Sequence, residues 1–122
     1  MNRVKVGKKY ENKVAAYLRD KGYTIFERNF RFHRKEVDII AGKDDLLVFV
    51  EVKYRRDGTF GSGLDAVTAR KRTNIQHVAV HYIDKKRLYD CNVRFDVASI
   101  EQDKLLYIED AFQFKSGPLW RE

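Results

Sequence analysis

The segment from Glu36 to Lys53 reads EVDIIAGKDDLLVFVEVK, and the rest of the chain can be arranged around it. Two apolar runs flank a short polar stretch, which is the pattern of a β-hairpin. Apolar residues follow one another in both runs, as in strands that are covered on both faces. Asp38, Glu51 and Lys53 interrupt these runs. Because unpaired charges are strongly destabilising in a covered sheet, these three side chains require partners or a function.

The register of this hairpin determines whether the two acidic side chains meet. Directly paired residues of an antiparallel hairpin share a face, and a four-residue loop over 43–46 pairs Asp38 with Glu51, their Cβ atoms about 5 Å apart. The same register pairs Glu36 with Lys53. Since adjacent carboxylates repel each other, a cation is expected between them, and a divalent metal ion is the leading candidate.

Length and composition favour one domain over residues 1–122, because the chain is 43% hydrophobic and long enough to bury a core. Residues 115–122 are expected to form a loose tail. The single cysteine, Cys91, excludes an internal disulfide, and no run of about 18 apolar residues indicates membrane insertion. We therefore expect a cytoplasmic protein without a membrane partner. The net charge of +7 favours a polyanionic partner.

Hydrophobic spacing predicts the remaining elements and their order. The long helix between the hairpin and the later strands indicates a crossover connection. We expect an α/β fold, with a mixed β-sheet flanked by helices in the order α-β-β-β-α-β-β. The expected elements are a helix over 8–21 that stops at Gly22, a strand over 23–30, the hairpin, a helix over 64–83 that Ser62 could cap, and strands over 93–100 and 105–108.

Two charged residues fall on the apolar faces of the expected helices. Glu11 shares its face with Val14 and Leu18, so its carboxylate points partly inward. The alternative for Glu11 is an edge position with a solvated tip. Lys71 lies on the inner stripe of the second helix, where it either snorkels to solvent or reaches a phosphate.

Metal-dependent cleavage of phosphodiester bonds explains the hairpin charges most economically. Asp38, Glu51 and the carbonyl of Val52 would bind Mg²⁺ or Mn²⁺, which prefer oxygen ligands. Lys53 would stand beside the attacking water and stabilise the charge that grows on the phosphoryl oxygens. Glu11 could hold a metal-bound water or a second ion.

A purely structural interpretation accounts for the same charges with ordinary contacts, and the residues alone do not exclude it. Glu-x-Lys by itself is weak support for a nuclease, because both residue types are common in this chain. The structural contacts would be an ion pair of Glu36 with Lys53, an ion pair of Glu51 with Arg55 or Lys71, and a backbone hydrogen bond to Asp38.

Basic side chains precede the hairpin, follow it, and open the second helix. Phosphate groups are the usual partners of such side chains in nucleic-acid-binding proteins. The residues expected to contact DNA are Arg34, Lys35, Arg55, Arg56, Arg70, Lys71 and Arg72.

A series of short motifs, loose individually but specific in their order and spacing, covers most of the chain. They are Glu11 with residues 15–18, Gly22-Tyr23, Arg28-Asn29, residues 36–41, residues 48–53, Phe60-Gly61, Ala66-Val67 with Lys71, and residues 94–97. In these motifs the chain resembles the YraN-like family of small predicted bacterial endonucleases. That family is itself similar to archaeal Holliday-junction resolvases of the PD-(D/E)xK nuclease superfamily.

This resemblance implies a restriction-endonuclease-like core, Mg²⁺ as cofactor and DNA as partner. It also implies that Glu11, Asp38, Glu51 and Lys53 occupy the active-site positions of the superfamily. Branched DNA is the substrate favoured by this analogy, and a homodimer would match the two-fold symmetry of a four-way junction. The alternatives are a non-catalytic DNA-binding module on the same fold and a basic protein–protein adaptor.

Overall fold

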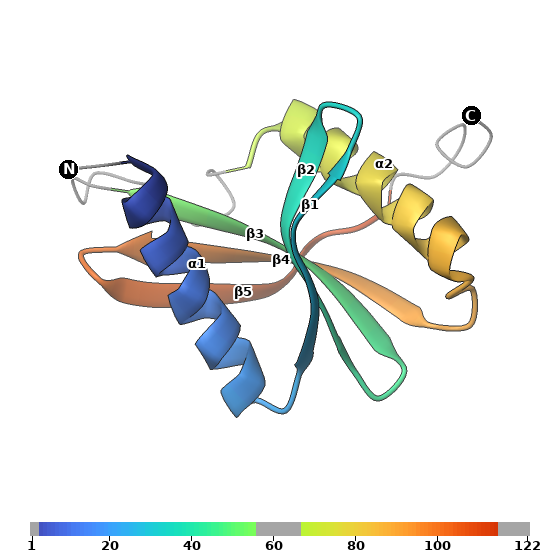
Figure 1. Cartoon of the computed structure of the whole chain (residues 1–122), viewed down its shortest axis with the longest axis horizontal. Helices are drawn as coiled ribbons and strands as arrows, with labels where there is room; N and C mark the ends of the chain where they lie inside the picture. The colour runs from blue at the N-terminus through green and yellow to red at the C-terminus, as the bar shows by residue number, and fades with distance from the viewer. Residues whose placement is uncertain (1–2, 56–66, 115–122) are drawn as a thin grey trace.

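The computed structural model describes residues 3–55 and 67–114, which form one mixed sheet of five strands with a helix on each face (Figure 1). The element order is the one expected from the sequence. The predicted start of the second helix at Leu64 was wrong, because Thr68 is extended and the helix begins at Ala69. Leu64, Ser62 and the predicted 115–122 tail themselves lie outside the described residues. The elements are α1 (Arg3–Asp20), β1 (Thr24–Phe32), β2 (Lys35–Lys43), β3 (Leu46–Arg55), α2 (Ala69–Lys86), β4 (Asn92–Glu101) and β5 (Lys104–Phe112).

Local signals define the ends of both helices. Gly22 adopts φ +93°, and the backbone N–H groups after α1 fold back onto its last carbonyls, which ends the helix as predicted. Thr68 caps the start of α2, because its hydroxyl accepts a 3.2 Å hydrogen bond from the backbone N–H of Lys71. Arg87 ends α2 in the left-handed conformation. Neither helix is long and apolar enough to cross a membrane, within the residues that the structure describes.

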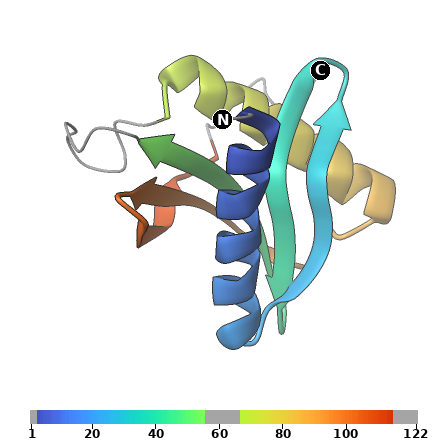
Figure 2. The same cartoon turned by 60° about the vertical axis from the view of Figure 1, so that its left-hand side comes forward.

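The strands carry an apolar core on each face, as the uninterrupted apolar runs predicted. Figure 2 shows α1 in front of the strands and α2 behind them. The core beneath α1 contains Val14, Ala15, Leu18, Ile39, Ala41, Val48, Val50, Ala98 and Ile100. The core beneath α2 contains Val37, Ile40, Leu47, Phe49, Ile75, Val78, Tyr82, Phe95 and Val97.

The β2–β3 hairpin has the predicted register but a shorter loop. Lys43 pairs with Leu46, so the turn consists of residues 44–45 and not of the predicted 43–46. Asp44 adopts φ +55°, and this left-handed conformation lets the chain reverse within two residues. The predicted four-residue loop and the observed two-residue loop both place Gly42 opposite Leu47, so the error in loop length leaves the register unchanged.

The sheet splits between β2 and β3. Their ladder ends at the pair of Ile39 with Val50. Beyond this point β2 remains paired with β1, and β3 remains paired with the parallel strand β4. Figure 1 shows the two strands diverging, β2 toward the start of α2 and β3 toward the start of α1. Asp38 and Glu51 are the next residues after the last pair, so they lie at the apex of the split.

This split overturns the predicted ion pair between Glu36 and Lys53. Glu36 pairs across β1 and β2 with Arg31, and their Oε2 and Nη2 atoms are 3.8 Å apart. Lys53 instead lies beside Glu51 on its own strand. The hairpin register would have joined Glu36 and Lys53 only if the ladder had continued to the strand ends.

Candidate active site

Asp38 joins the two strands at the apex of the split. Its Oδ2 accepts a 2.7 Å hydrogen bond from the backbone N–H of Val52. Burial, first, and then the adjacent carboxylate of Glu51 raise the pKa of Asp38 to about 7, against the opposing effects of the Val52 hydrogen bond and of Lys71. Asp38 therefore changes its charge near neutral pH.

Glu51 is 3% exposed, and its two carboxylate oxygens differ in their surroundings. Oε2 lies 3.4 Å from Nζ of Lys53 and 3.5 Å from Nζ of Lys71. Oε1 is buried and has no hydrogen-bond partner. A buried oxygen without a partner is costly, so this position suits an additional donor or a cation. Lys71 on α2 thus forms an ion pair with Glu51. The structural interpretation of the sequence had offered Arg55 or Lys71 as this partner.

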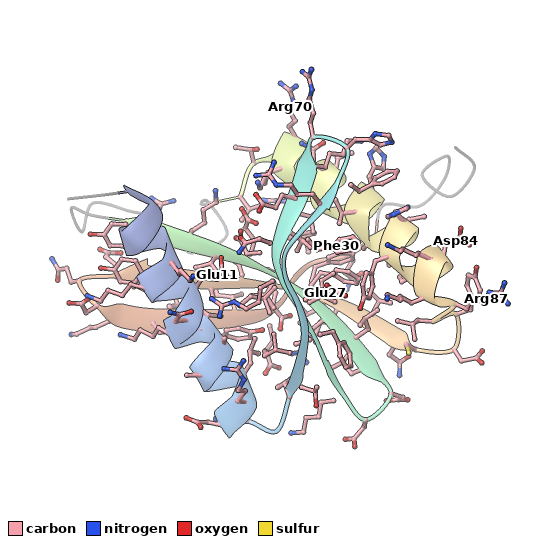
Figure 3. The ribbon with its side chains drawn as sticks, viewed as in Figure 1. Glu11, Glu27, Phe30, Arg70, Asp84 and Arg87 are labelled. Atoms are coloured by element: carbon pink, nitrogen blue, oxygen red, sulfur yellow. The ribbon has the colours of Figure 1, made fainter. Side chains whose placement is uncertain are left out.

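Glu11 projects from α1 toward the sheet (Figure 3). Its Oε1 accepts hydrogen bonds from Nε of Arg28 at 2.9 Å and Nδ2 of Asn29 at 3.0 Å. Asn29 adopts φ +53°, which turns its side chain out of the regular strand alternation. Glu11 therefore points inward, as its helical face predicted, but it has its own counter-ion on β1.

Arg28 and Asn29 were not among the predicted site residues, although they hold Glu11 in place. The available signal was a run of three polar side chains, Glu27-Arg28-Asn29, in the middle of a predicted strand. Their partner could not be identified from this signal, because α1 and β1 meet only through the tertiary fold.

An open cleft of about 590 Å³ lies on the α1 side of the split. By strand alternation Val52 and Tyr54 face α1, whereas Glu51 and Lys53 face α2. Asp38 lies at the boundary between these two sides. The residues that line the cleft are Gly7, Lys8, Tyr10, Glu11, Arg28, Asn29, Asp38, Val52 and Tyr54.

The oxygen atoms at the apex fit a hard divalent cation such as Mg²⁺. Asp38 and Glu51 contribute carboxylates, and Oε1 of Glu51 lacks a partner. The N–H of Val52 points to Asp38, and its carbonyl points the same way, because both groups of a strand residue face one neighbour. Among residues 3–55 and 67–114, no three His, Cys, Asp or Glu side chains converge on one metal position. Glu11 is therefore separate from the Asp38–Glu51 pair.

Three of the basic residues predicted to contact DNA lie near the β1–β2 turn and the start of α2. Arg34 is exposed in the turn, and Arg70 extends away from the body of the protein (Figure 3). Nζ of Lys35 lies 2.6 Å from Nδ1 of His77, so this hairpin end contacts α2. These side chains form a positive rim on the α2 side of the split.

The remaining basic residues have different surroundings. Arg55 is the last residue of β3, and Arg56 lies outside the described residues. Arg72 donates a 3.1 Å hydrogen bond to the carbonyl of Val67, and its guanidinium lies 5.9 Å from the ring centre of Phe112. Arg72 therefore contributes to the packing of α2 against β5.

Residues 10–100, which include all four predicted catalytic positions, match the family described as "Uncharacterised protein family UPF0102". The chain belongs to this family. The UPF0102 protein of Sulfurihydrogenibium sp. is 36% identical over 115 residues, which cover 94% of this chain and 100% of that protein. The UPF0102 protein of Fusobacterium nucleatum is 40% identical over 110 residues, covering 90% and 92%. That of Clostridium acetobutylicum is 43% identical over 115 residues, covering 89% and 94%.

Among solved structures, that of the protein SSO0001 aligns with 95% of this chain and 55% of its own length. The two share 15% sequence identity with a TM-score of 0.42, a similarity too weak to establish a shared fold. The comparisons thus confirm the family part of the resemblance seen in the sequence.

Proposed function

We propose that this UPF0102 protein is an endonuclease that hydrolyses DNA phosphodiester bonds with a bound Mg²⁺ or Mn²⁺ ion. The observation that carries the proposal is the pair of acidic residues at the apex of the split sheet. Glu51 has a buried oxygen without a partner, and Asp38 has a pKa raised by burial and by Glu51. A divalent cation between them would satisfy the free oxygen and favour the ionised form of Asp38.

The bound ion would act as a Lewis acid that polarises a phosphoryl oxygen. Asp38, Glu51 and the carbonyl of Val52 would hold it. Lys53 is half-buried, and its ammonium lies 3.4 Å from Oε2 of Glu51, so it would stand close to a phosphate bound at this pair. Positive charge fixed at this place would stabilise the negative charge that develops on the phosphoryl oxygens.

Lys71 and Glu11 have supporting roles in this proposal. Lys71 shares Oε2 of Glu51 with Lys53, and it can turn to a phosphate when a cation neutralises Glu51. Glu11, fixed by Arg28 and Asn29, borders the cleft that Asp38 also lines. Its carboxylate would orient a water molecule or a nucleotide next to the scissile bond.

The charge distribution supports DNA as the partner. The chain has a net charge of +7. Arg34 is exposed in the β1–β2 turn, and Arg70 extends from the start of α2 (Figure 3). Such side chains bind phosphates without reading sequence, so they would position the duplex over the apex. The proposed complex should therefore weaken steeply as the salt concentration rises.

A non-catalytic DNA-binding module is the second candidate. It is favoured by the contacts that already neutralise the site, namely the two lysines at Oε2 of Glu51 and the backbone hydrogen bond to Asp38. These are the contacts of a purely structural charge cluster. The two candidates differ in whether bound DNA is cleaved.

The test uses labelled four-way junction, duplex and single-stranded DNA, incubated with Mg²⁺ or Mn²⁺. The nuclease proposal expects cleavage that is lost in Asp38→Asn and in Lys53→Ala, while DNA binding is retained. Lys86→Ala is the matched control, because this exposed lysine ends α2 away from the apex. Salt-sensitive binding without cleavage would establish the binding module, and cleavage that survives in Asp38→Asn would exclude the proposed site.

A further inference from the structure

The cleft between α1 and the split sheet has the size and chemistry of a nucleobase site. We propose that it receives one unpaired base of the DNA, so that the substrate contains unpaired nucleotides next to the scissile bond. The inference rests on the proposed function, because it takes Asp38 as the position of the scissile phosphate. The cleft measures about 590 Å³, within the range of small-molecule pockets.

One wall of the cleft is an aromatic stack. The rings of Tyr10 on α1 and Tyr54 on β3 are stacked, with centroids 4.3 Å apart and planes inclined by 15°. Tyr10 is buried, whereas Tyr54 is 38% exposed and lines the cleft. Tyr10 therefore supports one face of Tyr54 and leaves part of that ring accessible. Exposed rings of this kind are platforms on which unpaired bases stack, whatever their sequence.

The polar lining of the cleft matches the edge of a base that has lost its pairing partner. Arg28 and Asn29 are fixed by their hydrogen bonds to Glu11, so donors and acceptors have set positions beside the aromatic wall. An unpaired base exposes hydrogen-bonding groups that a duplex would keep occupied. Lys8 is exposed at the same cleft, where an ammonium group can meet the sugar–phosphate backbone.

The position of the cleft joins base binding to the proposed chemistry. Asp38 and Val52 belong both to the apex and to the lining of the cleft. A phosphate held at Asp38 would therefore have an adjacent base within reach of Tyr54. A base stacked and paired inside a duplex is not available to this cleft, since it must first leave the stack. For unpaired nucleotides at a branch, bulge or flap, the free energy needed to unpair and unstack the base is smaller.

The test measures binding of the full chain without divalent ions, so that no strand is cut. The probe is a short duplex carrying 2-aminopurine either as an unpaired bulge or within a pair. We expect the wild-type protein to bind the bulged DNA roughly tenfold more tightly than the perfect duplex and to quench its fluorescence by stacking. Tyr54→Leu should lose both effects, whereas Tyr54→Phe, which retains the ring, should keep them.

Gly7 provides a second variant that leaves the aromatic stack intact. A Cβ atom at Gly7 would meet no atom within 4 Å, so a side chain fits there, and Gly7 shares the cleft-lining face of α1 with Tyr10 and Glu11. Gly7→Leu should weaken binding of the bulged DNA, while Gly7→Ala should leave it nearly unchanged. Melting temperatures of all variants distinguish a blocked cleft from a disturbed fold.

Equal affinity for bulged and perfect duplex, or an undiminished preference in Tyr54→Leu and Gly7→Leu, would overturn the inference. The outcome is separable from that of the proposed function. Cleavage that is as fast on perfect duplex as on bulged DNA would refute the base site and leave the nuclease proposal standing. A preference for bulged DNA without any cleavage would refute the nuclease proposal and support the base site.

Discussion

The backbone N–H of Val52 on β3 donates a 2.7 Å hydrogen bond to the carboxylate of Asp38 on β2. In a continuing ladder this N–H would meet a backbone carbonyl of β2. The side chain of Asp38 takes that role at the point where β2 turns away. One acidic residue thus closes the end of the ladder and, with Glu51, forms the acidic pair of the site.

Replacing Asp38 should separate its structural role from its charge. Asp38→Ala leaves the N–H of Val52 without its acceptor, which should lower the free energy of unfolding by about 1–3 kcal/mol. Asp38→Asn keeps an acceptor oxygen and removes the repulsion with Glu51, so its stability at about pH 8 should equal or exceed that of wild type. Urea denaturation of the metal-free proteins checks this. Equal stabilities of the Ala and Asn variants would show that the hydrogen bond contributes nothing.

The raised pKa of Asp38 predicts a pH dependence of stability in the metal-free protein. Its pKa is about 7 in the folded chain against 3.8 for an unperturbed group. Between these values the folded state retains a proton that the unfolded state has lost. The free energy of unfolding should therefore fall as the pH rises from about 4 to 7, by up to about 4 kcal/mol from this group. Asp38→Asn should flatten the profile over this window, and identical wild-type and variant profiles would contradict the prediction.

Divalent ions should stabilise the protein in proportion to the ionisation of Asp38. At about pH 8 the carboxylate is ionised, and Mg²⁺ at a hundred times its dissociation constant would add about 2.7 kcal/mol. At about pH 5 the bound proton competes, so the rise in melting temperature should be smaller. Thermal unfolding with MgCl₂, compared with NaCl at equal ionic strength, measures the effect. The stabilisation should disappear in the Asp38→Asn, Glu51→Gln double variant, and its persistence there would place the ion elsewhere.

A buried network around Asp96 should determine the stability of the β4–β5 pair. Asp96 is fully buried and accepts hydrogen bonds from Arg94, from the Tyr107 hydroxyl and from the backbone N–H of Asp110. Burial and Asp96 raise the pKa of Tyr107, which keeps this hydroxyl a donor. Asp96→Ala removes the buried partner of Arg94 and leaves it only the exposed Glu109, so it should cost about 3–5 kcal/mol. Tyr107→Phe removes one hydrogen bond and should cost about 1 kcal/mol.

Urea denaturation, monitored by circular dichroism, measures the loss of stability in Asp96→Ala and in Tyr107→Phe. Glu109→Ala is a suitable control, because Glu109 is exposed and lies 3.6 Å from the same guanidinium of Arg94. Surface ion pairs contribute little, so this variant should change stability by less than about 1 kcal/mol. A loss in Glu109→Ala as large as that in Asp96→Ala would contradict the assignment.

The sequence by itself determined the element order, the two covered faces of the sheet and the register of the central hairpin. These features depend on local patterns, namely apolar spacing, consecutive apolar residues in strands and the glycine after α1. It also identified Asp38, Glu51 and Lys53 as charged residues within apolar strands. The helical spacing of Glu11 with Val14 and Leu18 predicted that its carboxylate points inward. The predicted length of the β2–β3 loop was wrong. The two aspartates of the turn did not indicate that Asp44 adopts a left-handed conformation, which shortens the loop to two residues.

Only the tertiary structure decided where the hairpin ladder ends and which charges meet. The split between β2 and β3 arises because each strand continues with its other neighbour, β1 or β4, and such pairings join residues far apart in the chain. The split separated Glu36 from Lys53 and gave the carboxylate of Asp38 a backbone partner. Contacts across elements likewise brought Lys71 to Glu51, and Arg28 and Asn29 to Glu11. Periodicity fixes the face on which a side chain lies, but its partners depend on packing between elements.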